Sequence, residues 1–400
     1  GRREADEANK PAEVEAIEAF LFSQAEFRHN VITHHCEIRW TEEAGFLPLT
    51  DRDVNTLWGR MNKTVGRVYL TDIYNVIHSE FVPLFNPFQS YFDHLPSWDG
   101  VSDPIGDLAD TVHVKSDQAE FRDYFRKWFV GILPALLDDT VVNHEILVLI
   151  GEQGLYKTTW FNFLLPPELR CYFYTKTNSD RLNKDDLFSL TEFALICFEE
   201  LDGMRPAELN QLKAMVTMPY VNERAAYGRN KERHPHIASF CGTGNNVQFL
   251  TDPTGNRRWL PFEVSQIRDP HLHAIPYELV YSQAYALWKS GFCHWFSQEE
   301  IRKLNMHNSR FEVPNLEEDL IRTHFRKPFE GEAGIFVTAA DILEQISSCL
   351  RYPLSPNKIG RIMAGLEFES IRYKGKRGYI AVKKTGEDID RERRSGALGL

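Results

Sequence analysis

The sequence predicts an α/β protein built around a parallel sheet, and three observations support this prediction. Residues 146–150 are five consecutive apolar residues, which is typical of a strand buried on both faces of a sheet. Further apolar strands alternate along the chain with helices, and such alternation implies parallel pairing. Prolines mark the helix limits, because Pro166-Pro167 ends the first helix and Pro206 opens the second. The expected strands are 146–150, 193–198, 237–243 and 258–264, with helices near 157–165 and 206–218.

The region before this core, residues 1–115, is expected to be mainly helical. Helical spacing of apolar residues runs through about 11–30, and Leu95-Pro-Ser-Trp-Asp-Gly100 has the composition of a turn. From 118 to 137, apolar and aromatic residues recur every three or four positions. This pattern predicts an amphipathic helix that leads into a core domain spanning 116–265.

The chain after the core divides into three expected parts. Residues 266–330 form a helical segment, with helical spacing at 277–288 and 298–304. Residues 331–384 contain two helices, 339–350 and 355–366, followed by a hairpin over 368–382 with a basic tip, an order that resembles a winged helix. The tail 385–400 is charged and glycine-rich and is expected to be disordered.

The winged-helix-like part has two possible partners. If it binds nucleic acid, basic residues of its second helix and of its hairpin would contact phosphates. The alternatives are an ordinary solvated hairpin turn and a domain that mediates protein contacts. The basic residues concerned are Lys358, Arg361, Lys374, Lys376 and Arg377.

Composition excludes several classes of protein. Hydrophobic residues make up 42% of the 400 residues and aromatic residues 12%, which excludes general disorder, and no apolar run reaches the length of a membrane span. Six cysteines without paired spacing fit a reducing cytoplasm and predict no structural zinc. A net charge of −11 argues against a general nucleic-acid coat protein. The N-terminus lacks an apolar signal core and an initiator Met, so the chain is compatible with a fragment of a longer protein.

The first candidate site follows the strand 146–150 directly. Two glycines free the backbone to turn its N–H groups toward phosphate oxygens, and the helix that begins near Thr158 points its positive end at the same anion. Lys157 would bring positive charge to the β- and γ-phosphates, and the hydroxyl of Thr158 would coordinate Mg²⁺. The segment therefore predicts an ATP site formed by Gly151, Glu152, Gln153, Gly154, Leu155, Tyr156, Lys157, Thr158 and Thr159.

Tyr156 departs from the usual phosphate-binding pattern, which has glycine immediately before the lysine. Either that position tolerates a side chain, or the nucleotide is held differently from a standard P-loop. The alternative for the whole motif is a strand-to-helix turn that contains glycine and an incidental lysine. The acidic and amide motifs further along the chain argue against this alternative.

Acidic residues end the next predicted strand. ATP hydrolysis needs one carboxylate near Mg²⁺ and another to orient and deprotonate the attacking water, and the carboxyl ends of central strands lie where ligands bind. Glu199 and Glu200 are the candidates for catalysis, with Glu199 beside Thr158 as a metal ligand. Asp202 is expected to cap the following turn instead. The alternative is an acidic strand end that faces solvent.

The third strand ends in amides, and an arginine pair follows. Asn245 is predicted to hydrogen-bond the γ-phosphate or the attacking water. Arg257 and Arg258 are candidates to stabilise charge on the γ-phosphate of a neighbouring subunit, because a ring places the edge of one protomer over the nucleotide of the next. A surface ion pair is the alternative for either arginine.

These motifs together resemble the virulence-associated protein E family, whose ATPase core is similar to superfamily-3 DNA helicases. The resemblance covers roughly 95 to 265, and the later region 266–384 resembles the C-terminal extension of versions carried by mobile elements of Bacteroides-type bacteria. The motifs are Gly-Glu-Gln-Gly-Leu-Tyr-Lys-Thr-Thr, Phe-Glu-Glu-Leu-Asp, Tyr-Gly-Arg, Gly-Thr-Gly-Asn-Asn and Asp-Pro-Thr-Gly-Asn-Arg-Arg, in this order.

The resemblance implies an AAA+-like hexameric ATPase that acts on DNA, often beside a primase, although no primase motif is visible here. It assigns Walker A roles to Lys157 and Thr158, Walker B roles to Glu199 and Glu200, the sensor role to Asn245 and the finger role to Arg257 or Arg258. A hairpin of these helicases enters the central pore and holds single-stranded DNA. Its counterpart spans 223–236, with phosphate contacts from Arg229, Lys231 and Arg233, while Tyr227 supports the turn or stacks on a base. Glu223 and Glu232 dilute this charge, so the alternative is an exposed hairpin of mixed charge, and Arg224 could serve the ATP site instead.

Three functions remain open on the sequence. The first is an ATP- and Mg²⁺-dependent motor that translocates on single-stranded or forked DNA as a hexameric ring, in replication or mobilisation of a genetic element. The second is an ATP-switched DNA-binding initiator or loader without processive unwinding. The third is a P-loop kinase or a degenerate scaffold, against which the paired glutamates and the late arginine pair argue.

Overall fold

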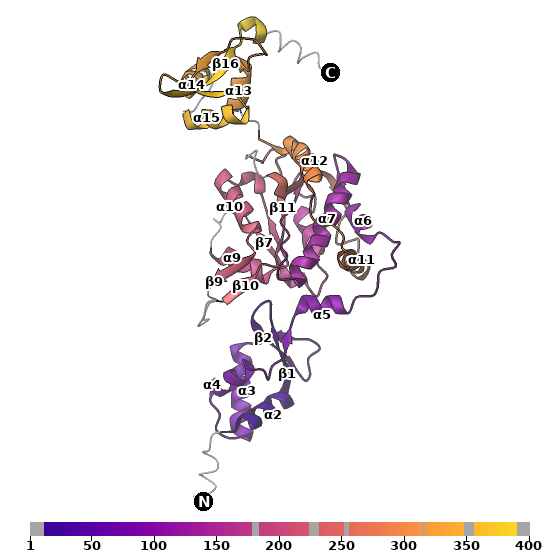
Figure 1. Cartoon of the computed structure of the whole chain (residues 1–400). Helices are drawn as coiled ribbons and strands as arrows, with labels where there is room; N and C mark the ends of the chain where they lie inside the picture. The colour runs from indigo at the N-terminus through magenta and orange to yellow at the C-terminus, as the bar shows by residue number, and fades with distance from the viewer. Residues whose placement is uncertain are drawn as a thin grey trace, which may run out of the picture. The chain divides into compact units, whose positions relative to one another are not determined.

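The computed structural model describes residues 12–177, 184–223, 232–251, 256–313, 316–347 and 356–389 (Figure 1). The chain divides into two compact units, Gly1–Glu312 and Val313–Leu400. No described helix is long and apolar enough to cross a membrane.

The first part of unit 1 mixes helices with a small sheet. Its strands have the order β3-β2-β1-β4, and helices α2, α3 and α4 share a separate apolar core with them. The prediction of a mainly helical region missed this sheet: helical spacing was expected through about residue 30, but the helix ends at Gln24 and the strand that follows buries Ala25 and Phe27. The elements are α2 (Val14–Gln24), β1 (Ala25–Asn30), β2 (His35–Trp40), β3 (Leu47–Pro48), α3 (Asp51–Thr64), α4 (Leu70–Ile77) and β4 (Leu84–Phe85).

A long apolar helix links this part to the central sheet. Helix α7 (Gln118–Leu137) has the predicted bounds, and the Asp117 carboxylate accepts hydrogen bonds from the N–H groups of Ala119 and Glu120 at its start. The indole N–H of Trp128 in this helix donates a hydrogen bond to the carbonyl oxygen of Phe240 at 3.0 Å. This bond fixes the helix to the sheet. The preceding elements are α5 (Pro87–Asp93), α6 (Pro104–Ala109) and β5 (Val112–Val114).

The central sheet has six strands in the order β5-β12-β6-β11-β8-β7, all parallel except β5 at one edge. The five residues of β6 are fully buried and alternate between two apolar cores, with Leu147 in one and Val148 in the other. Both faces are therefore covered, α7 and α11 lying on one side and α10 on the other (Figure 1), which confirms the α/β class. The strands are β6 (Ile146–Ile150), β7 (Phe173–Lys176), β8 (Leu195–Phe198), β11 (Ser239–Gly244) and β12 (Trp259–Ile267).

Helices and a hairpin complete unit 1. The hairpin of β9 (Tyr220–Glu223) and β10 (Glu232–Pro235) projects as a separate two-stranded sheet after α10. The helices are α8 (Lys157–Phe163), α9 (Lys184–Glu192), α10 (Pro206–Val216), α11 (Tyr277–Lys289) and α12 (Gln298–Asn308), with short 3-10 turns η1 (Arg170–Tyr172), η2 (Leu201–Gly203), η3 (Asn256–Arg258) and η4 (Ser309–Phe311).

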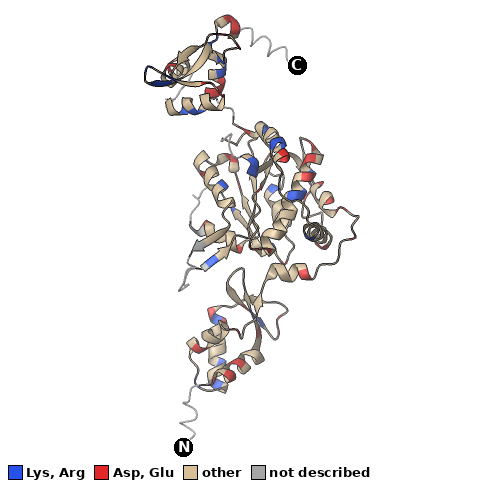
Figure 2. Cartoon of the chain, in the orientation of Figure 1, with Lys and Arg blue, Asp and Glu red and all other residues tan. Residues whose placement is uncertain are grey.

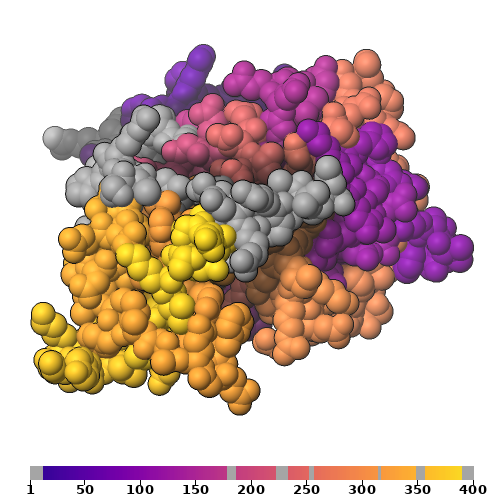
Figure 3. Space-filling model, turned by 90° about the horizontal axis from the view of Figure 1, so that it is seen from above, coloured from indigo at the N-terminus to yellow at the C-terminus, as the bar shows by residue number. Residues whose placement is uncertain are grey.

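Unit 2 packs three helices against a small antiparallel sheet, and Figure 3 shows its atoms, orange to yellow, as one body. Strand β16 pairs with β13, β14 and β15, and Lys374 and Gly375 form a two-residue turn with positive φ. The unit begins at Val313, so α13 belongs to it rather than to the helical segment expected over 266–330. The elements are α13 (Leu316–His324), β13 (Phe325–Arg326), β14 (Ile335–Val337), α14 (Ala339–Ser347), α15 (Pro356–Gly365), β15 (Ser370–Tyr373) and β16 (Lys376–Lys383).

The tail expected to be disordered, 385–400, is described only as far as residue 389. There Thr385 and Asp388 exchange hydrogen bonds at the start of a short helical turn, in which the N–H of Thr385 donates to the Asp388 carboxylate at 3.0 Å. These first five residues of the tail are therefore locally structured. Residues 390–400 lie outside the described part of the chain.

Candidate functional site

The loop between β6 and α8 depends on glycine at two positions. At Gly151 a Cβ atom would stand 3.0 Å from the carbonyl oxygen of Val264, so the position requires close backbone approach. Gly154 has φ +84°, a conformation that residues with a side chain rarely adopt. Tyr156 adopts the left-handed region as well, with φ 60° and ψ 18°, immediately before the first helical residue. The predicted departure from glycine therefore falls at a position where the backbone favours glycine.

Lys157 points back into the loop that precedes it. Its Nζ donates to the carbonyl oxygens of Gly151 and Glu152, both at 2.7 Å, and to Oδ1 of Asn245 at 3.4 Å. The lysine is buried, and burial lowers its pKa while the negative charge of Asp202 raises it. The structure thus brings the predicted lysine and the predicted polar sensor together from β6 and β11, which are adjacent strands.

Thr158 and Glu199 form the second contact of the site. The threonine hydroxyl donates to Oε1 of Glu199 at 2.7 Å, which joins the first turn of α8 to the end of β8. Hydroxyl and carboxylate oxygens are the ligand types that Mg²⁺ prefers, and Mg²⁺ completes its shell with phosphate and water oxygens rather than with a full protein cage. The pair therefore fits a Mg²⁺ ion that is shared with a nucleotide.

Asp202 has a role that the sequence analysis did not identify. Its carboxylate accepts hydrogen bonds from the backbone N–H groups of Asn245 at 3.2 Å and Asn246 at 3.0 Å. The sequence predicted that Asp202 caps the turn after β8, whereas these two contacts reach across to the loop after β11. The Gly-Thr-Gly run could have indicated this, since a Cβ at Gly244 would stand 3.0 Å from Oδ1 of Asp202.

These residues surround one cavity of about 360 Å³ at the carboxyl edge of the sheet. Glu200 lines this cavity directly after β8 and Glu199. Its own backbone lies in the left-handed region, with φ 55° and ψ 43°. Of the predicted nucleotide-binding residues, Gly151 and Glu152 do not line the cavity, although their carbonyl groups hold Lys157. The lining residues are Gln153, Gly154, Leu155, Tyr156, Lys157, Thr158, Thr159, Glu199, Glu200, Thr243, Gly244 and Asn245. Thr243 and Gly244 were not predicted.

The arginine pair lies at the other end of the sheet. Arg257 and Arg258 form η3 just before β12, and the register places the next residue, Trp259, beside Ile146 at the start of β6. The loop that holds Lys157 follows the other end of β6, so the pair cannot join that site within one chain. Arg257 is exposed, whereas Arg258 is partly buried, which lowers its pKa, while nearby Glu145 raises it.

The predicted DNA contacts are described only in part. Arg229 and Lys231, together with Tyr227 and Arg224, lie outside the described residues. Arg233 is exposed on β10, and its guanidinium lies 3.3 Å from the ring centroid of Tyr220 on β9.

The predicted basic contacts of unit 2 are all accessible. Lys376, Arg377, Arg361 and Lys374 are exposed. Lys358 is exposed as well and also forms an ion pair with the buried Glu317, so its phosphate contact stays a prediction.

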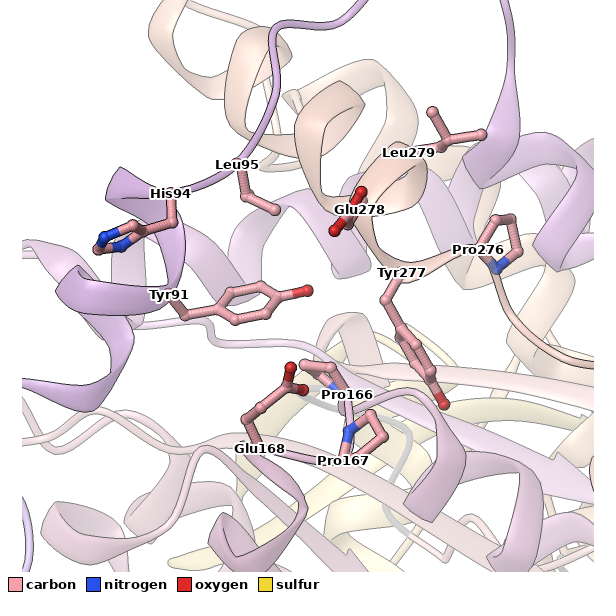
Figure 4. Close-up of a pocket in the computed structure, with 10 residues that line it drawn as sticks. All are labelled: Tyr91, His94, Leu95, Pro166, Pro167, Glu168, Pro276, Tyr277, Glu278 and Leu279. Carbon is pink, nitrogen blue, oxygen red and sulfur yellow. The ribbon is translucent and has the colours of Figure 1, made fainter. Parts of the chain in front are cut away.

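A second cavity, of about 480 Å³, has chemistry unsuited to phosphate (Figure 4). The hydroxyl of Tyr91 points into the space between the carboxylates of Glu168 and Glu278, and it is buried without a hydrogen-bond partner among the described residues. Burial and these two carboxylates raise the pKa of Tyr91. Proline, tyrosine, leucine and histidine side chains form the other walls. A nucleotide triphosphate would be repelled here.

One comparison with known proteins identifies a family. A family model described as the virulence-associated protein E-like domain matches residues 93–313. No curated protein matches the chain. Among solved structures, the A form apo structure of the NrS-1 C-terminal region-CTR has a TM-score of 0.50 at 10% identity, covering 92% of this chain and 99% of that one. The apo structure of the NrS-1 C-terminal region (305–718) has a TM-score of 0.48 at 11% identity, covering 93% and 99%. The similarity to the first of these two structures is a similarity of fold alone.

Proposed function

The chain belongs to the virulence-associated protein E-like family, and from this membership and the geometry of the β6–α8 site we propose that it is an ATP-hydrolysing enzyme that uses Mg²⁺ and acts on DNA. The observation that supports this most is the convergence of Lys157, Thr158, Glu199 and Asn245 on one cavity, through contacts of 2.7 to 3.4 Å. Two of these side chains come from the start of α8 and the other two directly follow β8 and β11, and all four are residue types that phosphoryl transfer uses.

Each residue has a role that follows from its place. Lys157 neutralises the terminal phosphates, and exchange of its carbonyl acceptors for phosphate oxygens restores its hydrogen bonds. Glu200, next in the chain to the metal-binding Glu199, orients and deprotonates the attacking water. Asn245 holds the γ-phosphate or that water, and Asp202 fixes the backbone of Asn245. Mg²⁺, held by Thr158 and Glu199, supplies charge neutralisation at the phosphates.

The position of the arginine pair supports a shared site. Because Arg257 lies at the opposite end of the sheet from Lys157, it can act on a nucleotide only if that nucleotide is bound by another copy of the chain. We therefore propose an AAA+-like ring, a hexamer by the family resemblance, in which exposed Arg257 is the finger residue. Arg258, partly buried near Glu145, is assigned a structural role.

The coupling of hydrolysis to DNA distinguishes two versions of the proposal. In the first, the β9–β10 hairpin and the winged-helix-like unit 2 hold single-stranded or forked DNA while the ring translocates, in replication or mobilisation of a genetic element. In the second, the protein is an ATP-switched initiator or loader. A strand-displacement assay separates them, because the initiator consumes ATP and remodels DNA without progressive release of the displaced strand.

Two substitutions test the ATP site at separate steps. Lys157→Ala should weaken nucleotide binding by more than about tenfold, because it removes a charged hydrogen-bond donor. Glu200→Gln should leave binding nearly unchanged and lower turnover by about 10²-fold or more, because the water loses its base. Binding is measured by titration with a fluorescent ATP analogue and turnover by phosphate release.

The matched control is Lys303→Ala on α12, which removes an exposed lysine paired with Glu299 and should change neither quantity. Hydrolysis at the wild-type rate by both the Lys157 and the Glu200 variants would disprove the proposed site.

A further inference from the structure

The sheet of unit 2 has an inner face and an outer face, and the strand register assigns residues to each. Tyr379 and Ala381 of β16 are buried in the core, and the hydroxyl of Tyr379 donates to the carbonyl of Gly360 on α15. Neighbouring residues along a strand point to opposite faces, so Lys376, Gly378 and Ile380 lie on the outer face. Residues paired across the strands share a face, which adds Phe336 and Tyr373 to that outer face.

Two aromatic rings lie together on this outer face. The rings of Phe336 and Tyr373 have centroids 5.5 Å apart and are tilted by 56°. A Cβ atom at Gly378 would stand 2.5 Å from the Phe336 ring, so glycine there lets the ring lie directly on the strand. Tyr373 remains 53% exposed. The face therefore offers an accessible aromatic surface rather than a packed one.

The charge around these rings has one sign. Between residues 370 and 384 the sequence has six basic residues and no acidic residue, although the chain as a whole has a net charge of −11. Figure 2 shows this basic character along the β15–β16 hairpin. Lys376 is paired with Tyr373 across the strands, and the Nζ of Lys374 lies 5.4 Å from the Tyr373 ring centroid. An anionic partner that also has flat rings matches this surface.

We propose that this outer face, defined by Phe336, Tyr373, Lys374 and Lys376, binds single-stranded nucleic acid by stacking an unpaired base on Tyr373. The two lysines contact the flanking phosphates. Exposed aromatic rings among basic side chains are the usual means of holding single strands, because every base has a face that can stack. The inference deepens the proposed action on DNA, since it assigns the contact to unpaired bases and to a named surface.

The same register separates two residues that the sequence grouped together. Arg377 is paired with Arg372, and both share the inner face with Tyr379, on the side where α15 lies. Lys376 lies on the outer face with Tyr373. Contacts made by Arg377 therefore belong to a surface beside α15, and contacts made by Lys376 belong to the stacking surface, although the two are neighbours in the chain.

Binding of an oligonucleotide with and without bases tests the proposal. The full chain is titrated, in the absence of ATP, into a labelled single strand and into a strand of the same length that carries abasic sites, and anisotropy is recorded. The wild-type protein should bind the intact strand about tenfold more tightly, as expected for stacking of one to two bases. Tyr373→Ala should lose this preference, and Tyr373→Phe, which keeps the ring, should retain it.

Two controls distinguish stacking from charge and from loss of structure. Phe329→Ala removes another exposed aromatic ring of unit 2 and should leave the base preference unchanged. Lys376→Ala should weaken binding of both strands equally, because it removes a phosphate contact and leaves the ring of Tyr373 in place. Irradiation of a strand that carries 5-iodouracil should crosslink the base to the peptide that contains Tyr373.

A Tyr373→Ala protein with the full base preference would overturn the proposal, as would equal wild-type binding of intact and abasic strands. Equal binding would indicate a surface that recognises charge alone. Because ATP is absent, a failure here is independent of the ATP site, and normal ATP hydrolysis by Tyr373→Ala shows that the first unit is intact.

Discussion

At the scale of single residues, the site is shaped by backbone conformations that most side chains avoid. Tyr156 and Glu200, at the two sides of the cavity, both have left-handed φ angles, 60° and 55°. Such a conformation costs a residue with a side chain roughly 1–2 kcal/mol. Two strained residues in one small cavity are typical of a functional site, where the surrounding structure holds them in place.

Tyr156 can be tested by comparing glycine with alanine at the same position. Tyr156→Gly relieves the left-handed strain, whereas Tyr156→Ala removes the ring and keeps the strain. The glycine variant should therefore be the more stable of the two by about 1 kcal/mol, as measured by denaturant unfolding. It should also bind ATP at least as well as the wild type, because the standard motif has glycine here. Equal stability of the two variants would show that the conformation is not strained.

Glu145, just before β6, should make stability depend on pH. Burial raises its pKa from 4.5 to about 7, so the folded chain holds a proton there that the unfolded chain releases at lower pH. The stability contributed by this group is therefore full below pH 4.5, where both states hold the proton, and it is lost as the pH rises from 4.5 through about 7. Glu145→Gln should be more stable than the wild type at pH 8 by about 1 kcal/mol or more, with a smaller difference at pH 5.

Denaturant titrations at the two pH values measure this difference. Glu299→Gln, which changes an exposed carboxylate on α12, should show the same stability relative to wild type at both pH values. A Glu145→Gln gain that is identical at pH 5 and pH 8 would contradict the assigned burial effect.

At the scale of elements, the turn η2 connects two strand ends and depends on the small residues of β11. A Cβ at Gly242 would stand 2.2 Å from Cδ1 of Leu201 in η2, and Leu201 is fully buried. Asp202, the next residue, then reaches the backbone of Asn245. The glycine at 242 therefore positions the turn whose Asp202 carboxylate fixes the backbone of Asn245.

Gly242→Ala should destabilise unit 1 by about 1–3 kcal/mol, because the added methyl group overpacks a closed core. The double variant with Leu201→Ala should lose less stability than the sum of the two single variants, because the shortened side chain at 201 makes room for the added methyl group. Gly59→Ala in α3 is the control, since no atom lies within 4 Å of the added Cβ, and it should stabilise by up to about 1 kcal/mol. Thermal unfolding measures the stability of these variants. Unchanged stability of Gly242→Ala would show that η2 adjusts freely.

Sequence patterns predicted the elements marked by unbroken or regularly spaced apolar residues and missed those at edges. Strand β6 and helix α7 have the predicted bounds because unbroken or regularly spaced apolar residues mark them. Strand β7 was missed because it is short, lies at the edge of the sheet and is only partly buried. The cavity was predicted from motifs, whereas Asp202 was not, because its partners are backbone N–H groups 43 and 44 residues away.

At the scale of the whole molecule, the two ends of the central sheet carry different halves of the proposed chemistry. Arg257→Ala should still bind ATP and should lose turnover by about 10³-fold, because the finger acts on a neighbour's nucleotide. Arg258→Ala should retain most activity, since that side chain is partly buried beside Glu145. Nucleotide titration and phosphate release measure the two effects.

Mixing inactive variants tests the shared site directly. Lys157→Ala and Arg257→Ala proteins, each inactive, should recover turnover when combined, because some junctions then pair an intact lysine with an intact arginine. Recovery must increase with protein concentration, since it requires assembly. Co-assembled mixtures that never recover activity would exclude the ring with shared sites.

The placement of Lys157 and Arg257 at opposite ends of one sheet also sets how strongly a defective copy inhibits its neighbours. In the proposed ring each chain takes part in two junctions, contributing its lysine to one and its arginine to the other. A chain with one substitution silences a single junction, whereas a chain with both silences two. With junctions that act independently, a small admixture of the doubly substituted protein should therefore lower turnover twice as steeply as either single variant.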